Sequence, residues 1–499
     1  MAHNIQNNEN VIILVTGATG YVGGRLVPRL LESGYRVRCL VRDQTRLFGH
    51  PWLDEVEVVE GDVHKPETLP AAMQDVSAAY YLIHGMKGGQ VYADRDMIAA
   101  DNFAFAAKQA GVQRIIYLGE LADEQAELSP YLRSRIETGK ILRRGEVPVT
   151  EFRAGMIVGS GSALFEMIRY LSERQLFWIC PRWFYTLAQP IAIRNALDYL
   201  VAALENRASE RQVIEIGGPT RLIYADMLRA YAKIRGFKRL MIPVPVYSPK
   251  LSALWVHLVS PIHWRVVLPL IEGLHAESLV TNPLARELFP QIKLLDFSTA
   301  VELALEKFNT GQVETSWSDS LVNSAGDLEP YRFSVEEGMM IERRQKLLDL
   351  PPETVFRAYT GIGGDRGWLY MDWAWEIRGW MDKMVGGVGL RRGRRDPDDL
   401  RIGESLDFWR VEGLEPNRSM LLRAEMVTPG KAWLELKSQP RPGGKTLLML
   451  GAYFAPEGLP GLLYWYSLWP IHKFIFDGMV RNLTKRAQEI AEGVPASGS

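Results

Sequence analysis

The sequence predicts an α/β protein with a doubly wound parallel sheet, followed by a smaller α+β domain. Three observations lead to this prediction. The first 310 or so residues alternate short apolar runs with segments of helical periodicity. A glycine-rich turn joins the first apolar run to the first helical segment. After residue 332, tryptophan becomes frequent and strand-like alternation replaces the earlier pattern.

The expected sheet is built from short apolar runs that are separated by helices or turns. Strands are expected at 11–16, 35–41, 56–60, 78–83, 114–118, 149–153 and 212–216. Helices are expected at 21–33, 93–110, 131–144, 195–206, 225–235 and 298–309. Strands that alternate with helices form parallel sheets with right-handed crossovers, which gives the doubly wound arrangement.

The most apolar long segment is 251–274, but two prolines, a histidine and an arginine interrupt it. A continuous span of about 20 apolar residues would be needed to cross a bilayer. We therefore expect a buried or groove-lining helix pair here, with peripheral docking on a membrane surface as the alternative.

The second domain differs in composition from the first. Residues 1–310 are expected to form the first domain, including segments that roof its cleft, and the polar stretch 311–332 is expected to be a linker. Eight of the 14 tryptophans follow residue 332. Alternating runs at 419–425 and 432–436 precede a helical stretch at 464–491, which predicts an α+β domain over 333–499.

Bulk properties exclude several classes of protein. Hydrophobic residues make up 47% of the chain, charged residues 23%, and the formal net charge is -1. These values are typical of a globular protein and give no electrostatic footprint for nucleic acid. Cys39 and Cys180 lie in apolar contexts that favour buried thiols, and no Cys or His spacing suggests a metal site. The polar start of the chain lacks a signal segment, so a cytoplasmic location is expected.

The glycine-rich turn carries the strongest functional signal. Glycines after a strand allow a tight turn, and backbone N–H groups at the start of the next helix then face a pyrophosphate. The strand before the turn and the helix after it supply the context that the motif requires. The residues expected to contact a dinucleotide here are Gly17, Ala18, Thr19, Gly20, Tyr21, Val22 and Gly23.

Two further places refine the cofactor prediction. Arg42 follows the second strand, where an arginine can pair with the 2′-phosphate of NADP, so NADP(H) is favoured. Asp43 follows at once and leaves NAD(H) open, and an exposed loop arginine is the alternative for Arg42. Leu82, Ile83 and His84 lie at the carboxyl end of a strand, where open α/β sheets bind ligands, although a loop histidine without a role is an equal alternative for His84.

These residues resemble the short-chain dehydrogenase/reductase superfamily, in its atypical, NmrA-like branch with a Rossmann sheet. The resemblance runs from about Val11 to about Gly311 and includes Gly61-Asp62-Val63 and the stretch 189–194. The segments 386–397, 406–411 and 464–472 are similar to a C-terminal domain of uncharacterised function, which resembles START-like (SRPBCC-type) helix-grip proteins. That class implies a sheet around a long C-terminal helix, and it commonly encloses an apolar ligand.

The resemblance implies roles for four more residues. Asp62 would bind the adenine amine with Val63 beside it, although a turn aspartate is a common alternative. The superfamily uses a Ser or Thr, a Tyr, and a Lys four residues after the Tyr. Tyr131 matches the Tyr, but Arg135 stands in place of Lys, and an arginine cannot relay protons at neutral pH. Gly119-Glu120 occupies the serine position, where Glu120 does not replace a hydroxyl donor. Tyr131 as a packing residue is the favoured alternative.

In the second domain, Trp409 and His472 are candidate ligand-pocket residues, and a core role is the alternative for each. Asp407 and the arginines at 391, 392, 394 and 395 are further candidates for holding an anionic or carbonyl-bearing ligand, and a solvated loop is the favoured alternative for the arginines.

Three functions remain open from the sequence. The first is an NAD(P)H-dependent oxidoreductase that acts on an apolar carbonyl or enone. The second is a non-catalytic NADP(H)-binding redox sensor or scaffold, which the missing Ser and Lys favour. The third is a lipid or isoprenoid carrier with a nucleotide-binding domain. We expect the first, and the sequence does not fix the substrate or the oligomeric state.

Overall fold

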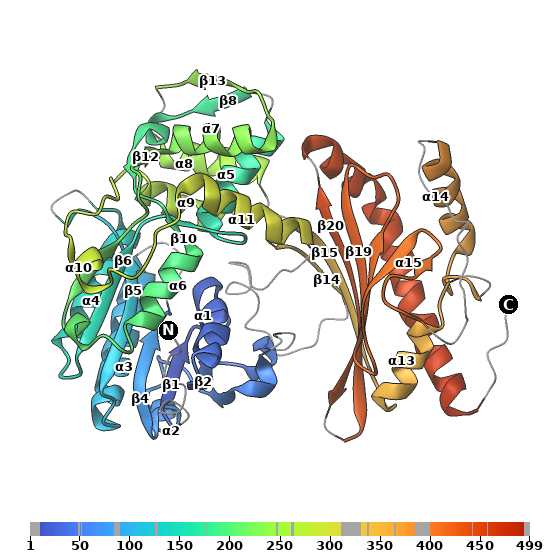
Figure 1. The fold of residues 1–499 in the computed structure, drawn as a ribbon, viewed down its shortest axis with the longest axis horizontal. Coiled ribbons are helices and arrows are strands. Elements are labelled where there is room, and N and C mark those ends of the chain that lie inside the picture. The colour runs from blue at the N-terminus through green and yellow to red at the C-terminus, as the bar shows by residue number, and fades with distance from the viewer. Residues whose placement is uncertain are drawn as a thin grey trace. The chain divides into compact units, whose positions relative to one another are not determined.

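The structure is a computed structural model and describes residues 10–47, 50, 52–83, 90–124, 128–175, 177–245, 248–260, 264–310, 331–336, 339–363, 366–384, 400–441, 443–456 and 458–493. The chain divides into two units (Figure 1). The N-terminal unit comprises Met1–Lys307 and Gln312–Ser324, and the C-terminal unit comprises Phe308–Gly311 and Ala325–Ser499.

The N-terminal unit contains a seven-stranded sheet in the order β11-β6-β5-β4-β1-β2-β3. Its neighbouring strands all pair in parallel, which confirms the predicted doubly wound parallel sheet. The strands are β1 Ile12–Thr16, β2 Arg36–Val41, β3 Glu57–Glu60, β4 Val76–Tyr81, β5 Arg114–Glu120, β6 Val149–Ala154 and β11 Val213–Ile216.

Helices cover both faces of this sheet because alternate strand residues point to opposite sides. Ile13 and Val15 pack with α1 and α6 on one face. Ile12 and Leu14 pack with α2, α3 and α4 on the other. The helices are α1 Tyr21–Glu32, α2 Leu69–Met73, α3 Gln90–Gln109, α4 Pro130–Arg144 and α6 Ile193–Ala202, with α10 Leu284–Leu288 beside β11.

A third cluster of buried residues lies beyond the sheet. It joins α5 Ala163–Arg174, α7 Tyr224–Arg235, α8 Pro249–Val259, α9 Trp264–Gly273, α11 Phe297–Thr310 and the parallel ribbon of β8 Phe177–Cys180 with β13 Leu240–Pro243. Short strand pairs β7 Ile157–Val158 with β10 Ile191–Ala192, and β9 Leu187–Ala188 with β12 Leu222–Ile223, link this cluster to the sheet.

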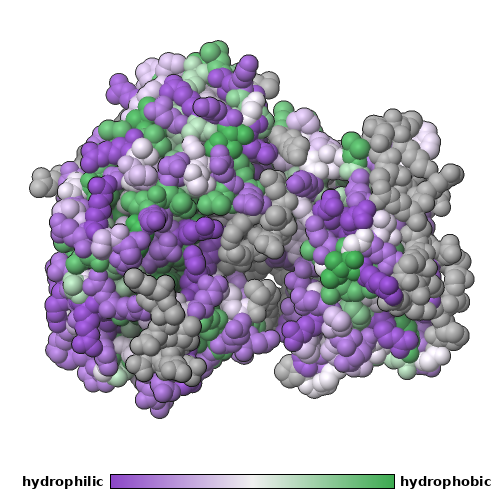
Figure 2. Space-filling model, viewed as in Figure 1, coloured by the Kyte–Doolittle hydropathy of each residue, from purple (hydrophilic) through white to green (hydrophobic). Residues whose placement is uncertain are grey.

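The apolar segment 251–274 forms α8 and α9, whose residues Ala253, Val256, Val267 and Ile271 are buried in that cluster. Among the described residues, no helix combines the length and hydropathy needed to cross a membrane. Hydrophobic residues also reach the surface at the end of the unit that carries β8 and β13 (Figure 2), where Phe177, Leu240 and Ile242 are exposed.

The C-terminal unit is an antiparallel sheet with helices, in the order β14-β15-β20-β19-β18-β17-β16. Its strands are β14 Tyr331–Glu336, β15 Met339–Leu348, β16 Ser405–Leu406, β17 Trp409–Glu415, β18 Ser419–Ala424, β19 Gly430–Arg441 and β20 Lys445–Pro456. Its helices are α13 Pro352–Thr360, α14 Asp372–Met384 and the 34-residue α15 Gly458–Ala491. The predicted α+β character is present, while the resemblance to START-like proteins stays a prediction.

The expected linker 311–332 lies outside the described residues, apart from its last two positions, which begin β14. Cys39 and Cys180 are both buried free thiols.

Candidate functional site

The glycine turn after β1 is sterically closed to larger residues. Gly17 has a φ of +74°, and a Cβ at this position would lie 2.7 Å from the carbonyl oxygen of Leu82. A Cβ on Gly23 would overlap the carbonyl oxygen of Gly17. Both glycines are therefore required, one by backbone conformation and one by the close packing of α1 against the turn.

The turn lies beside the carboxyl end of β4 because Thr16, the last residue of β1, is hydrogen-bonded to that end. Its hydroxyl donates to the carbonyl of Tyr80 over 2.9 Å and accepts from the backbone N–H of Leu82 over 3.1 Å. Leu82 and Ile83 are half-buried directly after β4. These predicted positions are thus brought to the glycine turn, while His84 lies outside the described residues.

The N-terminus of α1 has the features of a phosphate site. Gly20 is its N-cap and makes no side-chain capping hydrogen bond, and the first turn contains no acidic residue. Ala18 and Thr19 lie in the turn before the helix, where Ala18 is fully buried. Tyr21 and Val22 are the first two residues of the helix. Backbone N–H groups at the start of a 12-residue helix can bind an anion, so the residues present fit a dinucleotide pyrophosphate.

The residues expected around the adenosine half differ in exposure. Arg42 is exposed immediately after β2. Asp62 follows β3, and its Oδ1 accepts a hydrogen bond from the backbone N–H of His64 over 3.0 Å. This contact is the role expected of an aspartate that stabilises a turn, which is the alternative to adenine binding. Val63 is buried, and its carbonyl accepts from Nδ2 of Asn102 over 2.9 Å. All three lie beyond the carboxyl ends of neighbouring strands, as a cofactor site in this type of sheet requires.

Tyr131 and Glu120 form a hydrogen-bonded pair at the same edge of the sheet. Tyr131 lies in the first turn of α4, and its hydroxyl donates to Oε1 of Glu120, the last residue of β5, over 2.9 Å. Burial raises the pKa of Glu120 to about 7, against the opposing effects of Arg135 and of the hydrogen bond from Tyr131. Burial and the nearby Glu120 also raise the pKa of the Tyr131 hydroxyl well above its usual value.

Arg135 is buried one helical turn after Tyr131, with 7% of its surface exposed. Its Nη2 donates to the carbonyl of Leu118 over 2.8 Å, and its guanidinium lies 5.5 Å from the ring centroid of Tyr117. Arg135 thus fastens α4 to β5, and it lowers the pKa of Glu120 electrostatically. The structure therefore places it as a positioning residue behind the tyrosine.

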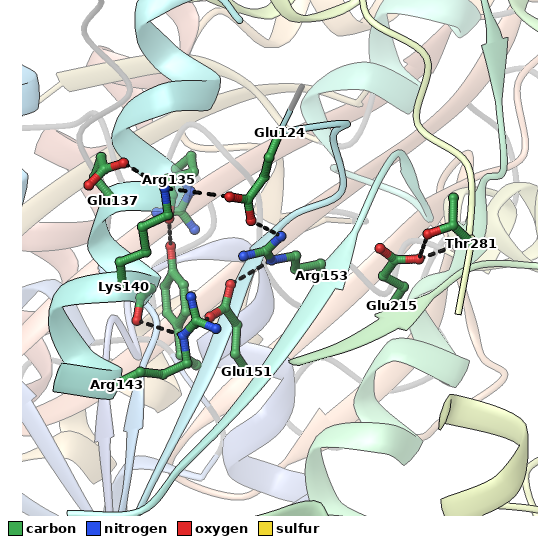
Figure 3. Close-up of polar contacts among 11 residues, drawn as sticks. Glu124, Arg135, Glu137, Lys140, Arg143, Glu151, Arg153, Glu215 and Thr281 are labelled. Carbon is green, nitrogen blue, oxygen red and sulfur yellow. Dashed lines mark hydrogen bonds and ion pairs between the residues drawn. The ribbon is translucent and has the colours of Figure 1, made fainter. Parts of the chain in front are cut away.

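A network of ion pairs fixes the rest of α4 to the sheet. Figure 3 shows Arg153 of β6 between two carboxylates, with its Nε 2.7 Å from Glu151 and its Nη1 2.7 Å from Glu124. Glu151 also pairs with Nε of Arg143 on α4 over 3.0 Å. Lys140 of the same helix pairs with Glu124 over 3.4 Å. The helix that carries Tyr131 is thereby held against β5 and β6.

Comparison with known families gives one match in each unit. Residues 17–160 match a family described as NAD(P)H-binding. Residues 17–160, which carry strands β2 to β6 of the parallel sheet, are thus similar to NAD(P)H-binding proteins. The match includes the glycine turn, Arg42, the Tyr131–Glu120 pair and Arg135. Residues 340–479 match a separate family of unknown function.

Individual relatives are more distant. The chain is 24% identical over 281 residues to the photosystem II assembly factor Ycf39 of Guillardia theta, covering 55% of this chain and 86% of that protein. It is 32% identical over 158 residues to a ceramide reductase of Caulobacter vibrioides, covering 30% of this chain and 47% of that protein. It therefore spans less than half the length of the reductase. A triphenylmethane reductase of Citrobacter sp. aligns with a TM-score of 0.49 at 20% identity, over 59% of this chain and 99% of that structure.

The candidates of the C-terminal unit lie in different surroundings. Trp409 of β17 is buried, and its ring centroid lies 6.1 Å from that of Trp368. Asp407 accepts from Nε1 of Trp368 over 2.9 Å, which is a structural role. His472 lies on α15 with its ring centroid 4.9 Å from that of Trp465. The four arginines from 391 to 395 fall outside the described residues.

Sequence reasoning missed two features of these sites. The sequence indicates only that Glu120 does not replace a serine hydroxyl. In the structure, Glu120 accepts the hydrogen bond of the Tyr131 hydroxyl. Its position at the end of a predicted strand was the available signal. Glu342 was not singled out, although a lone acidic residue in the apolar run Met339-Met-Ile-Glu-Arg could have drawn attention to it. Among the described residues, no group of His, Cys, Asp and Glu could hold a metal ion.

Proposed function

We propose that the N-terminal unit is an NADP(H)-dependent oxidoreductase that reduces a carbonyl or enone group of an apolar small molecule. The observation that carries this proposal is the 2.9 Å hydrogen bond from Tyr131 to Glu120 at the carboxyl edge of a sheet that also bears the glycine turn. A hydroxyl donor and a carboxyl group whose pKa is near 7 are together suited to acid–base catalysis at neutral pH.

The cofactor would be held by residues already at this edge. The backbone N–H groups at the start of α1 would bind the pyrophosphate, and the exposed Arg42 would pair with the 2′-phosphate of NADP(H). When bound, the reduced nicotinamide supplies a hydride. All further steps belong to side chains of this chain.

Reduction of a carbonyl requires one proton on the substrate oxygen for each hydride added to carbon. Tyr131 would donate this proton from its hydroxyl to the substrate oxygen, so that the O–H bond of the tyrosine breaks as that of the alcohol forms. The carboxylic acid form of Glu120, bonded to the same hydroxyl, would return a proton to Tyr131. Solvent would then reprotonate Glu120, and the residues would regain their initial state.

The electrostatics keep Tyr131 in the protonated form that the reduction step uses. Because burial and Glu120 raise the pKa of Tyr131, the tyrosine remains a neutral acid at physiological pH. A neutral tyrosine can donate to an oxygen on which negative charge develops, but it is a poor base for removing a proton from an alcohol. Arg135 keeps a positive charge nearby and moderates the cost of ionising Glu120.

Apolar side chains surround Tyr131 and support an apolar substrate. Ala122, Leu132 and Ile136 form a small buried cluster, and Leu128, Ala276 and Tyr131 itself pack against it. A substrate oxygen at the Tyr131 hydroxyl would thus have hydrocarbon neighbours, as in most small-molecule sites. The similarity to a protein named ceramide reductase agrees with such a substrate.

Oxidation of NADPH by a panel of apolar ketones and enones tests the proposal, with wild type and Tyr131→Phe compared. Calorimetric titration with NADPH, run in parallel, shows whether each protein still binds the cofactor. We expect turnover with at least one acceptor and a loss of about 100-fold or more in Tyr131→Phe at unchanged NADPH affinity. Absence of turnover with the whole panel, or equal turnover by the two proteins, would refute it.

A non-catalytic NADP(H) sensor is the second candidate, because Arg135 replaces the lysine that would hold the ribose and aid the tyrosine. Its guanidinium donates to the Leu118 carbonyl instead. This candidate predicts NADPH binding without turnover, together with a cofactor-dependent change in hydrogen exchange outside the glycine turn. Binding that changes only the exchange of the turn itself would count against it.

A further inference from the structure

The ribbon formed by β8 and β13 exposes apolar side chains on its outer face. The two strands pair in parallel, with Phe177 opposite Leu240 and Ile179 opposite Ile242. Residues that pair across two strands point to the same side, so these four side chains share one face of the ribbon. Leu240 is 70% exposed, Phe177 49% and Ile242 38%, while Ile179 is half-buried. This outer face is therefore both apolar and open to solvent.

The inner face of the ribbon already packs against the core of the unit. Trp178 and Cys180 alternate with the outer residues of β8 and are buried in the cluster that includes α5, α7 and α8. Met241, which lies between Leu240 and Ile242 on β13, packs against the same cluster. A surface strand with one face on the core usually presents polar side chains to water on the other face. An apolar outer face instead marks a surface that contacts a protein or a membrane.

Basic side chains are exposed close to this ribbon. Lys238 lies two residues before β13, and Arg182 lies two residues after β8. Lys233 in the last turn of α7 and Lys250 in the first turn of α8 are exposed as well. Figure 1 shows α7, α8, β8 and β13 together at one end of the N-terminal unit, and Figure 2 shows hydrophobic and hydrophilic residues side by side there. This end therefore combines an apolar face with positive charge.

Negative charge is scarce in the segments that build this end. Residues 174–197 and 227–271, which contain both strands and α8, hold ten lysines and arginines but no aspartate or glutamate. The carboxylates at the two borders are both paired with arginines, Glu173 with Arg235 over 3.2 Å and Asp226 with Arg229 over 2.6 Å. The positive charge of the exposed lysines is therefore not offset within these segments.

We propose that this end of the N-terminal unit docks on the surface of an anionic phospholipid membrane. Phe177, Leu240 and Ile242 would enter the boundary between headgroups and acyl chains, as the apolar face of an interfacial protein does. Arg182 and Lys238 would then lie at the level of the lipid phosphates and be attracted by them. The proposal concerns the outer surface of the unit and does not depend on the proposed reaction.

A second copy of the chain is a poorer partner for this surface. In a two-fold dimer the same patch of each copy meets the other, so the basic residues of the two copies would be brought together. Like charges that face each other across an interface weaken it, and the two segments provide no carboxylate to compensate. An anionic lipid surface supplies the negative charge that this end of the unit lacks.

Sedimentation of the full chain with lipid vesicles tests the proposal. One set of vesicles is pure phosphatidylcholine, and the other contains about one third phosphatidylglycerol, which gives it a negative surface. We expect at least tenfold tighter binding to the anionic vesicles, with the affinity falling as salt is raised because salt screens the attraction. Absence of binding to the anionic vesicles, or equal binding to both kinds, would overturn the proposal.

A triple variant tests whether the ribbon makes the contact. Phe177→Thr, Leu240→Thr and Ile242→Thr together remove the apolar outer face but keep residues that favour strands. We expect this variant to bind anionic vesicles at least tenfold more weakly than the wild type. The matched control replaces Ile98 and Phe105 of α3, which are 56% and 63% exposed, with glutamine. Figure 1 shows α3 against the sheet and away from β8 and β13, so the control should bind like the wild type.

A charge variant tests the same surface independently. Lys238→Gln should weaken binding to anionic vesicles roughly fivefold, the usual effect of one basic residue near a charged membrane. Lys108→Gln, at an exposed lysine of α3, should not. If the triple variant does not fold, Lys238→Gln must show the loss in its place. Wild-type affinity in the tested variant would contradict the proposal, as would a dimer of the unbound wild type that the triple variant dissociates.

Discussion

The hydroxyl of Tyr131 donates a hydrogen bond to Oε1 of Glu120 over 2.9 Å. The pair joins the first turn of α4 to the last residue of β5, at the edge of the sheet where the glycine turn lies. A carboxyl group thus occupies the place where the superfamily that the sequence resembles has a Ser or Thr hydroxyl. It can store and return a proton at neutral pH, which neither Arg135 nor a serine hydroxyl can do.

The first prediction concerns the pH profile of reduction. Because the protonated form of Glu120 must reload Tyr131 and its pKa is about 7, kcat should be constant below pH 6 and fall above pH 7. Glu120→Gln cannot supply a proton, so its kcat should be roughly 10- to 100-fold lower and independent of pH between 6 and 8. Steady-state rates across this range measure both effects.

Glu137→Gln provides the control. Glu137 is an acidic residue of α4, the helix that carries Tyr131, and its partner is Lys140 at 2.9 Å. Its profile should match the wild type. A Glu120→Gln profile that keeps the wild-type fall above pH 7 would show that another group causes it.

The second prediction concerns the glycine turn. Gly23→Ala places a methyl group on the carbonyl oxygen of Gly17, so α1 must move away from the turn. We expect NADPH affinity to fall at least 100-fold by calorimetry, because the helix N-terminus then no longer faces the pyrophosphate. Gly273→Ala is the matched control, since the nearest atom to its new methyl group would be Cγ of Leu132 at 3.8 Å. Equal losses in the two variants would exclude this explanation.

The sequence allowed the parallel sheet to be predicted because its central strands, such as β1, are buried on both faces and form short apolar runs. Gly17 and Gly23 were predictable for a related reason, since only glycine fits a left-handed turn and a close backbone approach. The partner of Tyr131 was not predictable in the same way. Glu120 lies 11 residues away along the chain, and only the packing of α4 on β5 brings the two together.

Glu342 shows the same limit in the C-terminal unit. Strand alternation places it on the same face as Met340, but the helix that buries this face begins more than 100 residues later. The sequence indicated that α15 would form and that His472 would lie on its apolar side. It could not show that the carboxyl oxygens of Glu342 would be buried without a hydrogen-bond partner among the described residues.

The third prediction concerns cofactor choice. Arg42→Ala should weaken NADPH binding roughly tenfold or more and leave NADH binding within about twofold, because only NADPH carries the phosphate that the guanidinium would pair with. Calorimetric titration of the wild type and of Arg42→Ala with NADPH and NADH gives the change in affinity for each cofactor. Asp43→Ala is the companion variant and should not weaken NADPH binding. A similar loss for both cofactors in Arg42→Ala would contradict the 2′-phosphate role.

The fourth prediction concerns stability. Glu151 is 1% exposed and pairs with Arg153 at 2.7 Å and with Arg143 at 3.0 Å. Glu151→Ala leaves the buried Arg153 with one partner fewer, so we expect the free energy of unfolding to fall by roughly 3–5 kcal/mol. Glu137→Ala removes a partly exposed ion pair with Lys140 on α4 and should cost under about 1 kcal/mol. Urea unfolding measures both changes. Similar losses in the two variants would show that the burial of an ion pair does not determine how much its removal lowers the free energy of unfolding.

The fifth prediction concerns the pH dependence of the C-terminal unit. Burial raises the pKa of Glu342 from its ordinary 4.5 to about 7, so the folded protein holds this proton more tightly than the unfolded chain does. The resulting stabilisation is complete below pH 4.5 and is lost as the pH rises towards 7, by up to about 3 kcal/mol. Glu342→Met removes the titration, so its advantage in melting temperature over the wild type should grow between pH 4.5 and 7. His472 acts in the opposite direction, because its pKa is lowered to about 4, but it is common to both proteins and cancels in the difference. A constant difference across this range would show that Glu342 does not titrate with a raised pKa.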